Sequence, residues 1–76
     1  MPGKKGDIEI GRRAVEELRE MFPELSNEAI AKRLHMDRNV IWLWMDGVTP
    51  SSIALQRMAL AGCDVKYILT GLRSDK

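Results

Sequence analysis

Hydrophobic residues recur at intervals of three and four positions along most of the chain, a spacing that places side chains on one stripe of an α-helix. The first series runs from Ile8 to Phe22, and Pro23 is expected to end it because proline cannot continue the backbone hydrogen-bond ladder. We therefore predict a first helix from Ile8. Its core-facing residues would be Ile8, Ala14, Val15, Leu18, Met21 and Phe22.

Two short helices are predicted next, with only His35 and Met36 between them. Ser26 can cap the first by accepting from backbone donors of its opening turn, and Asp37 can cap the second, which should stop before Gly47. The residues buried by the first of these helices would be Ile30, Ala31 and Leu34. So short a connection requires a sharp helix-turn-helix.

Two further helices are predicted after the loop "VTPSS". Ser51 or Ser52 can cap the fourth helix, which Gly62 closes, and Asp64 can cap a last short helix that ends at Gly71. The fourth helix is expected to turn Ile53, Leu55, Met58, Ala59 and Ala61 toward the core. For Tyr67, Ile68 and Leu69, the sequence leaves open whether they cover the core or form a seam between two copies.

The third helix divides into an inner and an outer face. On a helical wheel with Ile41 inward, Trp44 and Met45 share its face, so we expect both in the core. The outer face and its flanks carry Arg38, Asn39, Val40, Trp42, Leu43 and Asp46.

The outer face has side chains that suit the major groove of DNA. Arg38 carries a donor fork that pairs with guanine, and Asn39 has the donor and acceptor that pair with adenine. Val40 and Leu43 can pack on thymine methyl groups, and Trp42 flanks this reading surface. We predict that Arg38, Asn39, Val40 and Leu43 contact bases.

Contacts with phosphates must then come from other parts of the chain. The start of the second helix, the end of the loop and a basic amino-terminal arm supply the predicted phosphate contacts: Asn27, Ser51, Ser52, Lys4 and Lys5. Residues 1–7 should form the arm, because Pro2, Gly3 and Gly6 surround two lysines and no core residue.

Composition limits the fold and the chemistry. A chain of 76 residues with one Phe, one Tyr and two Trp fits a single all-helical domain. Twelve basic against eleven acidic residues give a net charge of +1, so any anion-binding site must be local.

Several function classes are disfavoured. The single cysteine excludes an intrachain disulfide and a cysteine-based zinc cluster, and His35 is the only histidine, with no nucleophile placed to pair with it. We expect no enzyme activity, cofactor, metal or small-molecule substrate. No apolar run approaches the roughly 20 residues of a membrane span, and the start lacks a signal peptide, so a cytoplasmic location is expected.

At "LSNEAIAKRLHMDRNVIWLWMDG" the chain resembles the Cro and repressor type of helix-turn-helix proteins from lambdoid phages and bacteria. Asn27 stands in the usual Gln position, Ala31 in the small-residue position and Ile41 in the buried aliphatic position. Trp44 and Gly47 match the common "W-x-x-G" ending. The segment "DVKYILTG" is also similar to the ending of phage repressor amino-terminal domains, so the resemblance covers about residues 8–71.

The resemblance implies a compact five-helix bundle of the lambda-repressor-like type, with the helix-turn-helix in its second and third helices. Because Gly71 should end the last helix, residues 72–76 are expected to form a frayed tail. The resemblance also implies a phage or prophage transcription regulator, acting as a repressor in the bacterial cytoplasm or nucleoid, that binds operator half-sites in double-stranded DNA as a homodimer. The implied base-contact positions are Arg38, Asn39, Val40 and Leu43, with Asn27 at a phosphate.

Four residues depart from the family pattern. His35 occupies a turn position where the family usually has Gly, and histidine adopts the left-handed conformation at a higher cost. Leu43 replaces a commonly polar reader, Trp42 a small or polar residue, and Asp46 adds a negative charge. An alternative therefore stays open: a helix-turn-helix fold that docks on a protein partner through Val40, Trp42 and Leu43.

Overall fold

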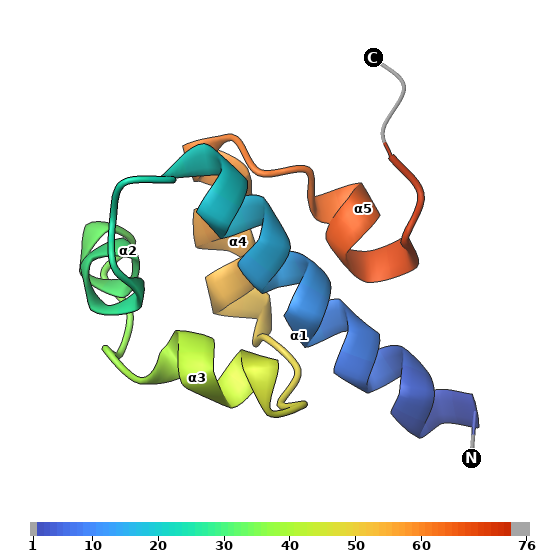
Figure 1. Cartoon of the computed structure of the whole chain (residues 1–76). Coiled ribbons are helices and arrows are strands. Elements are labelled where there is room, and N and C mark those ends of the chain that lie inside the picture. Colours follow the sequence, from blue (N-terminus) through green and yellow to red (C-terminus); the bar gives the residue numbers. More distant parts are fainter. Residues whose placement is uncertain (1, 74–76) are drawn as a thin grey trace.

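The computed structural model describes the backbone of residues 2–73 and the side chains of residues 9–73. Over these residues the chain forms five α-helices and no strand, which confirms the all-helical prediction (Figure 1). The helices are α1 (Pro2–Met21), α2 (Asn27–Arg33), α3 (Val40–Met45), α4 (Ser52–Ala61) and α5 (Val65–Thr70).

Helix α1 spans the whole molecule, and α3 and α5 pack against it (Figure 1). Its apolar stripe meets side chains from every other helix in one core. The buried members of this core are Ala14, Val15, Leu18, Ile30, Leu34, Ile41, Trp44, Ala54, Met58, Cys63 and Ile68. The core positions predicted for the second helix are therefore confirmed. The predicted core positions of the first helix are confirmed as far as the structure describes them, and Met21 and Phe22 lie at the edge of the core.

The first helix begins earlier than predicted. The backbone of residues 2–7, expected to be an arm outside the helix, belongs to α1, which starts at Pro2. Proline is tolerated in the first turn of a helix, and extension of a packed helix adds one backbone hydrogen bond per residue. The side chains of Lys4, Lys5 and Ile8 lie outside the described residues.

The predicted caps define three of the helix starts. The hydroxyl of Ser26 accepts from the amide of Ala29 at 3.2 Å, and that of Ser51 accepts from the amide of Ala54 at 3.1 Å. Asp64 caps α5 in the same way. At their carboxyl ends, α4 and α5 stop at Gly62 and Gly71 as predicted, and both glycines have a positive φ.

Two residues of α1 hold the two ends of α5. The Glu17 carboxylate accepts from the backbone amide of Asp64 at 3.0 Å, at the start of α5, and the Nε of Arg13 donates to the Ile68 carbonyl at 3.0 Å, near its end. A carboxylate at the amino end and a guanidinium at the carboxyl end both complement the helix dipole. This pairing docks α5 on α1.

One residue of the predicted tail, residues 72–76, is anchored to the bundle. Arg73 donates to Glu17 at 2.5 Å, and its guanidinium lies 3.9 Å from the centre of the Tyr67 ring. Of the three residues left open between core and seam, Ile68 is fully buried, whereas Leu69 is exposed and Tyr67 is half-buried. The rest of the predicted tail, residues 74–76, lies outside the described residues.

Some predicted core positions were wrong. Met45 is 36% exposed, because α1 crosses over the side of α3 that holds Trp44. On α4, Ala54 and Met58 point inward, so Ile53 is 60% exposed. Also exposed are Ala59 and Ala61. Apolar residues occur on all sides of α4, so their spacing did not identify the buried side.

The crossing of α1 and α3 depends on a glycine that the hydrophobic pattern did not single out. Gly11 is buried, and a Cβ atom at this position would lie 2.6 Å from the Trp44 carbonyl oxygen and 2.8 Å from that of Val48. Both distances are well inside van der Waals contact with rigid backbone. The backbone of α1 therefore rests directly on the carboxyl-terminal turn of α3.

We predict that Gly11→Ala lowers the free energy of unfolding by about 1 to 3 kcal/mol, because the added methyl group overpacks a backbone contact. This effect should outweigh the better helix propensity of alanine. Chemical denaturation of the variant measures it, with Arg12→Ala, at an exposed neighbouring position, as the control. If Gly11→Ala were as stable as the wild type, the two helices would not cross this closely.

Candidate functional site

The segment between α2 and α3, residues 34–39, forms a tightly bonded turn that we call the α2–α3 turn. His35 adopts a left-handed backbone conformation with φ of 58°. Its amide donates to the Lys32 carbonyl at 3.0 Å, and the Met36 amide donates to the Ala31 carbonyl at 2.9 Å. This pair of bonds is a Schellman motif, which satisfies the last carbonyls of α2 and reverses the chain.

The second half of the turn makes α3 begin later in the chain than predicted. The Asp37 carboxylate accepts from the Asn39 amide at 2.8 Å, and the Val40 amide donates to the Asp37 carbonyl at 3.0 Å. Asp37 therefore closes a local turn, and the predicted cap of the third helix is wrong because the helix-capping position falls on Asn39. Arg38 and Asn39 precede α3, and both side chains are exposed.

The six residues of α3 separate into an anchored and an exposed set. Ile41 is fully buried and Trp44 is 2% exposed, whereas Trp42 and Leu43 are 55% and 47% exposed. Val40 is half-buried and packs against the core. Of the predicted base-contact residues, Arg38, Asn39 and Leu43 are thus exposed, and Val40 is only partly so.

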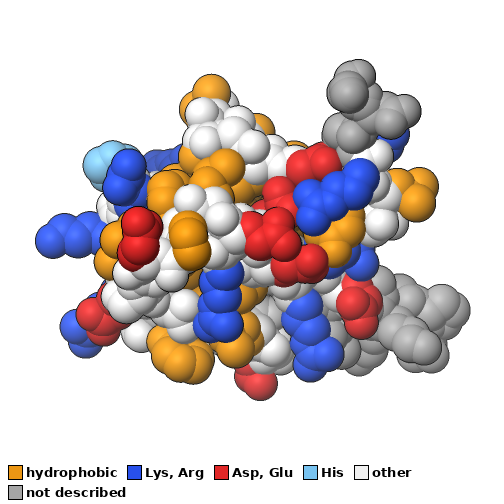
Figure 2. Space-filling model, turned by 45° about the horizontal axis from the view of Figure 1, so that its top comes forward, with side chains coloured by type: hydrophobic (Ala, Val, Ile, Leu, Met, Phe, Trp, Pro, Cys, Tyr) orange, Lys and Arg blue, Asp and Glu red, His pale blue; other side chains and the backbone are white. Residues whose placement is uncertain are grey.

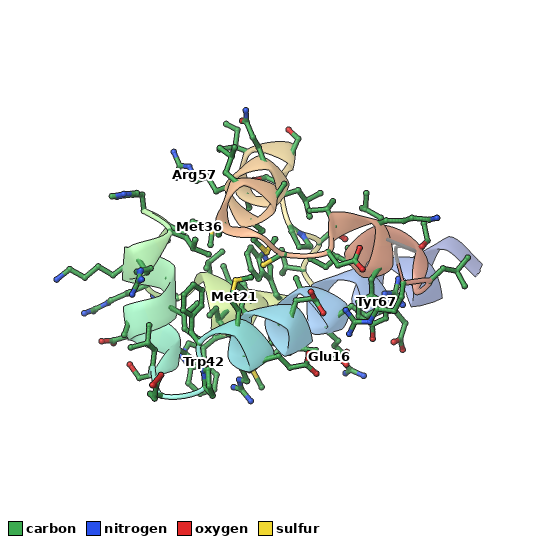
Figure 3. All side chains as sticks on the ribbon, turned by 90° about the horizontal axis from the view of Figure 1, so that it is seen from above. Glu16, Met21, Met36, Trp42, Arg57 and Tyr67 are labelled. Atoms are coloured by element: carbon green, nitrogen blue, oxygen red, sulfur yellow. The ribbon has the colours of Figure 1, made fainter. Side chains whose placement is uncertain are left out.

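Trp42 borders a shallow groove between α3 and the α1–α2 connection. Figure 3 shows it beside the carboxyl-terminal end of α1. The walls of the groove include Arg19, Phe22, Leu25, Ser26, Asn27 and Trp42. The exposed Trp42 ring therefore forms one wall of an apolar groove that also has polar atoms at its edge.

Arg19 links three helices at this groove. Its Nη2 donates to the Asn27 side-chain carbonyl at 3.2 Å and lies 3.7 Å from the sulfur of Met45. Sequence reasoning missed this residue, because its two partners are 8 and 26 positions away and no local pattern relates them. The bond occupies the Asn27 oxygen and leaves the amide N–H groups as donors.

The other predicted phosphate-contact residues are less well placed. The Ser51 hydroxyl already caps α4, and Ser52 is exposed in its first turn. The side chains of Lys4 and Lys5 fall among those that are not described. Among the three of these residues whose side chains are described, Asn27 alone has a side-chain bond beside the exposed side of α3.

Exposed cations gather around the α2–α3 turn. Lys32 and Arg38 border one shallow hollow with Met36, although Glu28 lies at the same hollow. Arg33 stands over the Phe22 ring at 5.3 Å, and the guanidinium of Arg57, on α4, donates to the backbone carbonyl of His35. The face shown in Figure 2 carries acidic, basic and hydrophobic side chains intermingled, in keeping with the near-neutral composition.

The described part of the chain gives little support for a metal site, a reactive thiol or a membrane-spanning helix. No group of three or more His, Cys, Asp and Glu residues there is arranged to hold a metal ion. Burial and the nearby Glu17 carboxylate raise the pKa of the Cys63 thiol to about 11, which keeps this core residue in its unreactive neutral form near pH 7. None of the helices in this part of the chain has the length and apolar composition that a membrane span requires.

Comparison of the chain with protein-family models, curated proteins and solved structures gave no match. The geometry of the α2–α3 turn and of the exposed side of α3 is therefore the basis for a functional proposal.

We predict that His35→Gly raises the free energy of unfolding by about 0.5 to 1 kcal/mol, because glycine adopts the left-handed conformation without the Cβ penalty. The gain is partial because glycine also gives the unfolded chain more freedom. Thermal or urea unfolding measures the change, and Gly47→Ala, at φ of 106°, should be destabilising in the same assay. A loss of stability in His35→Gly would mean that the imidazole makes a stabilising contact.

Proposed function

We propose that this protein is a sequence-specific DNA-binding transcription regulator, a Cro- or repressor-like protein of a phage or prophage that binds operator DNA as a dimer. In this proposal the bundle is of the lambda-repressor type and α2 and α3 are its helix-turn-helix. One observation carries it: α3 is anchored in the core by Ile41 and Trp44, while the neighbouring positions are exposed to solvent.

The reading face consists of Arg38, Asn39, Val40 and Leu43. Arg38 and Asn39 stand just before α3 with exposed side chains, where the amino-terminal end of a recognition helix enters the major groove. Arg38 has the donors for guanine and Asn39 the paired donor and acceptor for adenine. Leu43, one turn further on, supplies an apolar contact for a thymine methyl group.

Phosphate binding in this proposal is local. Arg19 orients the Asn27 amide so that its N–H groups can donate to a phosphate oxygen, and Lys32 adds a cation near the turn. Because Asp46 and Glu28 carry opposing charge nearby and the net charge is +1, non-specific binding should be weak. Selectivity must then come mainly from base contacts.

Two copies are needed, because one short helix reads too few base pairs for useful selectivity. Ile68 is committed to the core, so of the residues considered for a seam Tyr67 and Leu69 have surface available. Leu72 is also exposed, just after α5.

A second candidate function is docking on a protein partner. The observation that favours it is the exposed Trp42, which opens onto the groove lined by Phe22 and Leu25. Exposed aromatic residues beside an apolar recess are typical anchors of protein interfaces. An interface of this kind should respond little to salt, whereas DNA binding weakens steeply as salt rises.

To test the proposal, a preferred duplex is first selected from a random library and each of its base pairs is then varied. We predict that Arg38→Ala and Asn39→Ala each relax the preference at one or two positions by about 1 to 3 kcal/mol, because each removes a paired base contact. Fluorescence anisotropy with the duplex series measures this, and Arg12→Ala, at an exposed position on α1, is the control for lost charge. Unchanged base preference in both folded variants would overturn the assignment of the reading face.

A further inference from the structure

The α2–α3 turn is tied to α4 by one long side chain. The guanidinium of Arg57 donates to the backbone carbonyl of His35, across 22 positions of sequence. In Figure 3, Arg57 and Met36 lie near each other, at the opposite end of the molecule from Glu16 and Tyr67. The bonded carbonyl belongs to the residue with the left-handed conformation, so Arg57 contacts the point where the chain changes direction.

The other polar contacts of this turn are local. His35 and Met36 bond back to α2, and Asp37 bonds forward to Asn39. Among the described residues, Arg57 provides the one side-chain hydrogen bond that joins the turn to another helix of the bundle. A bond to a charged donor is stronger than a neutral one, so it limits how far the turn can move.

We propose that Arg57 is a positioning residue that fixes where the turn presents Arg38 and Asn39. The proposal rests on the DNA-binding function proposed above and adds to it a residue outside the reading face. Arg38 follows His35 by only three residues, with no helical turn between them to absorb a shift. A displacement of the His35 carbonyl is therefore passed on to the side chains that would pair with bases.

A different role has to be distinguished, since Arg57 is exposed and could bind a phosphate itself. A phosphate contact adds affinity for every duplex and contributes to salt dependence. A positioning residue instead affects the difference between preferred and scrambled duplexes. The two roles therefore predict different changes in one set of titrations: a phosphate contact alters the affinity for both duplexes, and a positioning residue alters the ratio of the two affinities.

The first experiment needs no DNA. Amide hydrogen exchange is measured in the wild type, in Arg57→Met and in Arg12→Met, a control that removes an exposed arginine from α1. We expect exchange at His35 and Met36 to become about tenfold faster in Arg57→Met, because the turn opens more often, with α1 and α5 amides unchanged. Unchanged exchange at the turn would overturn the proposal whatever the DNA result.

The second experiment compares binding to the selected and a scrambled duplex at several salt concentrations. We expect Arg57→Met to lower the ratio of the two affinities about tenfold with an unchanged salt slope, and Arg57→Lys, which retains a charged donor of similar reach, to restore most of the ratio. An equal loss on both duplexes, with a salt slope reduced by about one, would show a phosphate contact and overturn the positioning role.

The two experiments separate this proposal from the function on which it rests. Faster exchange at the turn combined with a wild type that prefers no duplex would overturn DNA reading, and the positioning of Arg38 and Asn39 with it. Faster exchange with selective wild-type binding and an unchanged affinity ratio in Arg57→Met would overturn the positioning role alone.

Discussion

The backbone of α1 rests directly on the last turn of α3 at Gly11, and the exposed side of α3 depends on that contact. A side chain at position 11 would meet the carbonyl oxygens of Trp44 and Val48, so only glycine permits this spacing. The crossing buries Trp44 between the helices and turns Trp42 and Leu43 to solvent. Further along the chain, Arg13 and Glu17 of the same helix hold the two ends of α5, so one helix positions both the candidate site and the carboxyl-terminal end of the fold.

Local signals in the sequence predicted much of this fold. The capping serines and Asp64, the helix-ending glycines and the apolar stripe of α1 act within a few residues, and the structure contains each of them. The wrong predictions concern positions that tertiary packing decides: α4 carries apolar residues on all sides, and Met45 stays 36% exposed although the Arg19 side chain of α1 contacts its sulfur. Gly11, Arg19 and Arg57 acquire their importance from partners on other helices, and one sequence gives no signal that relates such distant positions.

The candidate site combines a fixed backbone with an exposed surface of mixed character. Ile41 and Trp44 supply the buried contacts that fix α3, whereas the side chains of Arg38, Asn39 and Leu43 are exposed to solvent. Helix α3 and the two residues before it are therefore held in a defined geometry, and their exposed side chains are accessible to a partner. The exposed apolar residues of α3 suit thymine methyl groups in a DNA groove, and they equally suit a protein surface; the two partners differ in how strongly salt affects binding.

Salt dependence tests the central claim, that the exposed side of α3 reads DNA, most directly. Fluorescence anisotropy would follow the wild-type protein binding a labelled duplex selected from a random library, beside a scrambled duplex, at two salt concentrations. Our account predicts tighter binding to the selected duplex, with an affinity that falls steeply as salt rises because counterions are released from the phosphates. A folded protein that binds neither duplex selectively would contradict it and would make Trp42 and Leu43 the centre of a protein-docking surface.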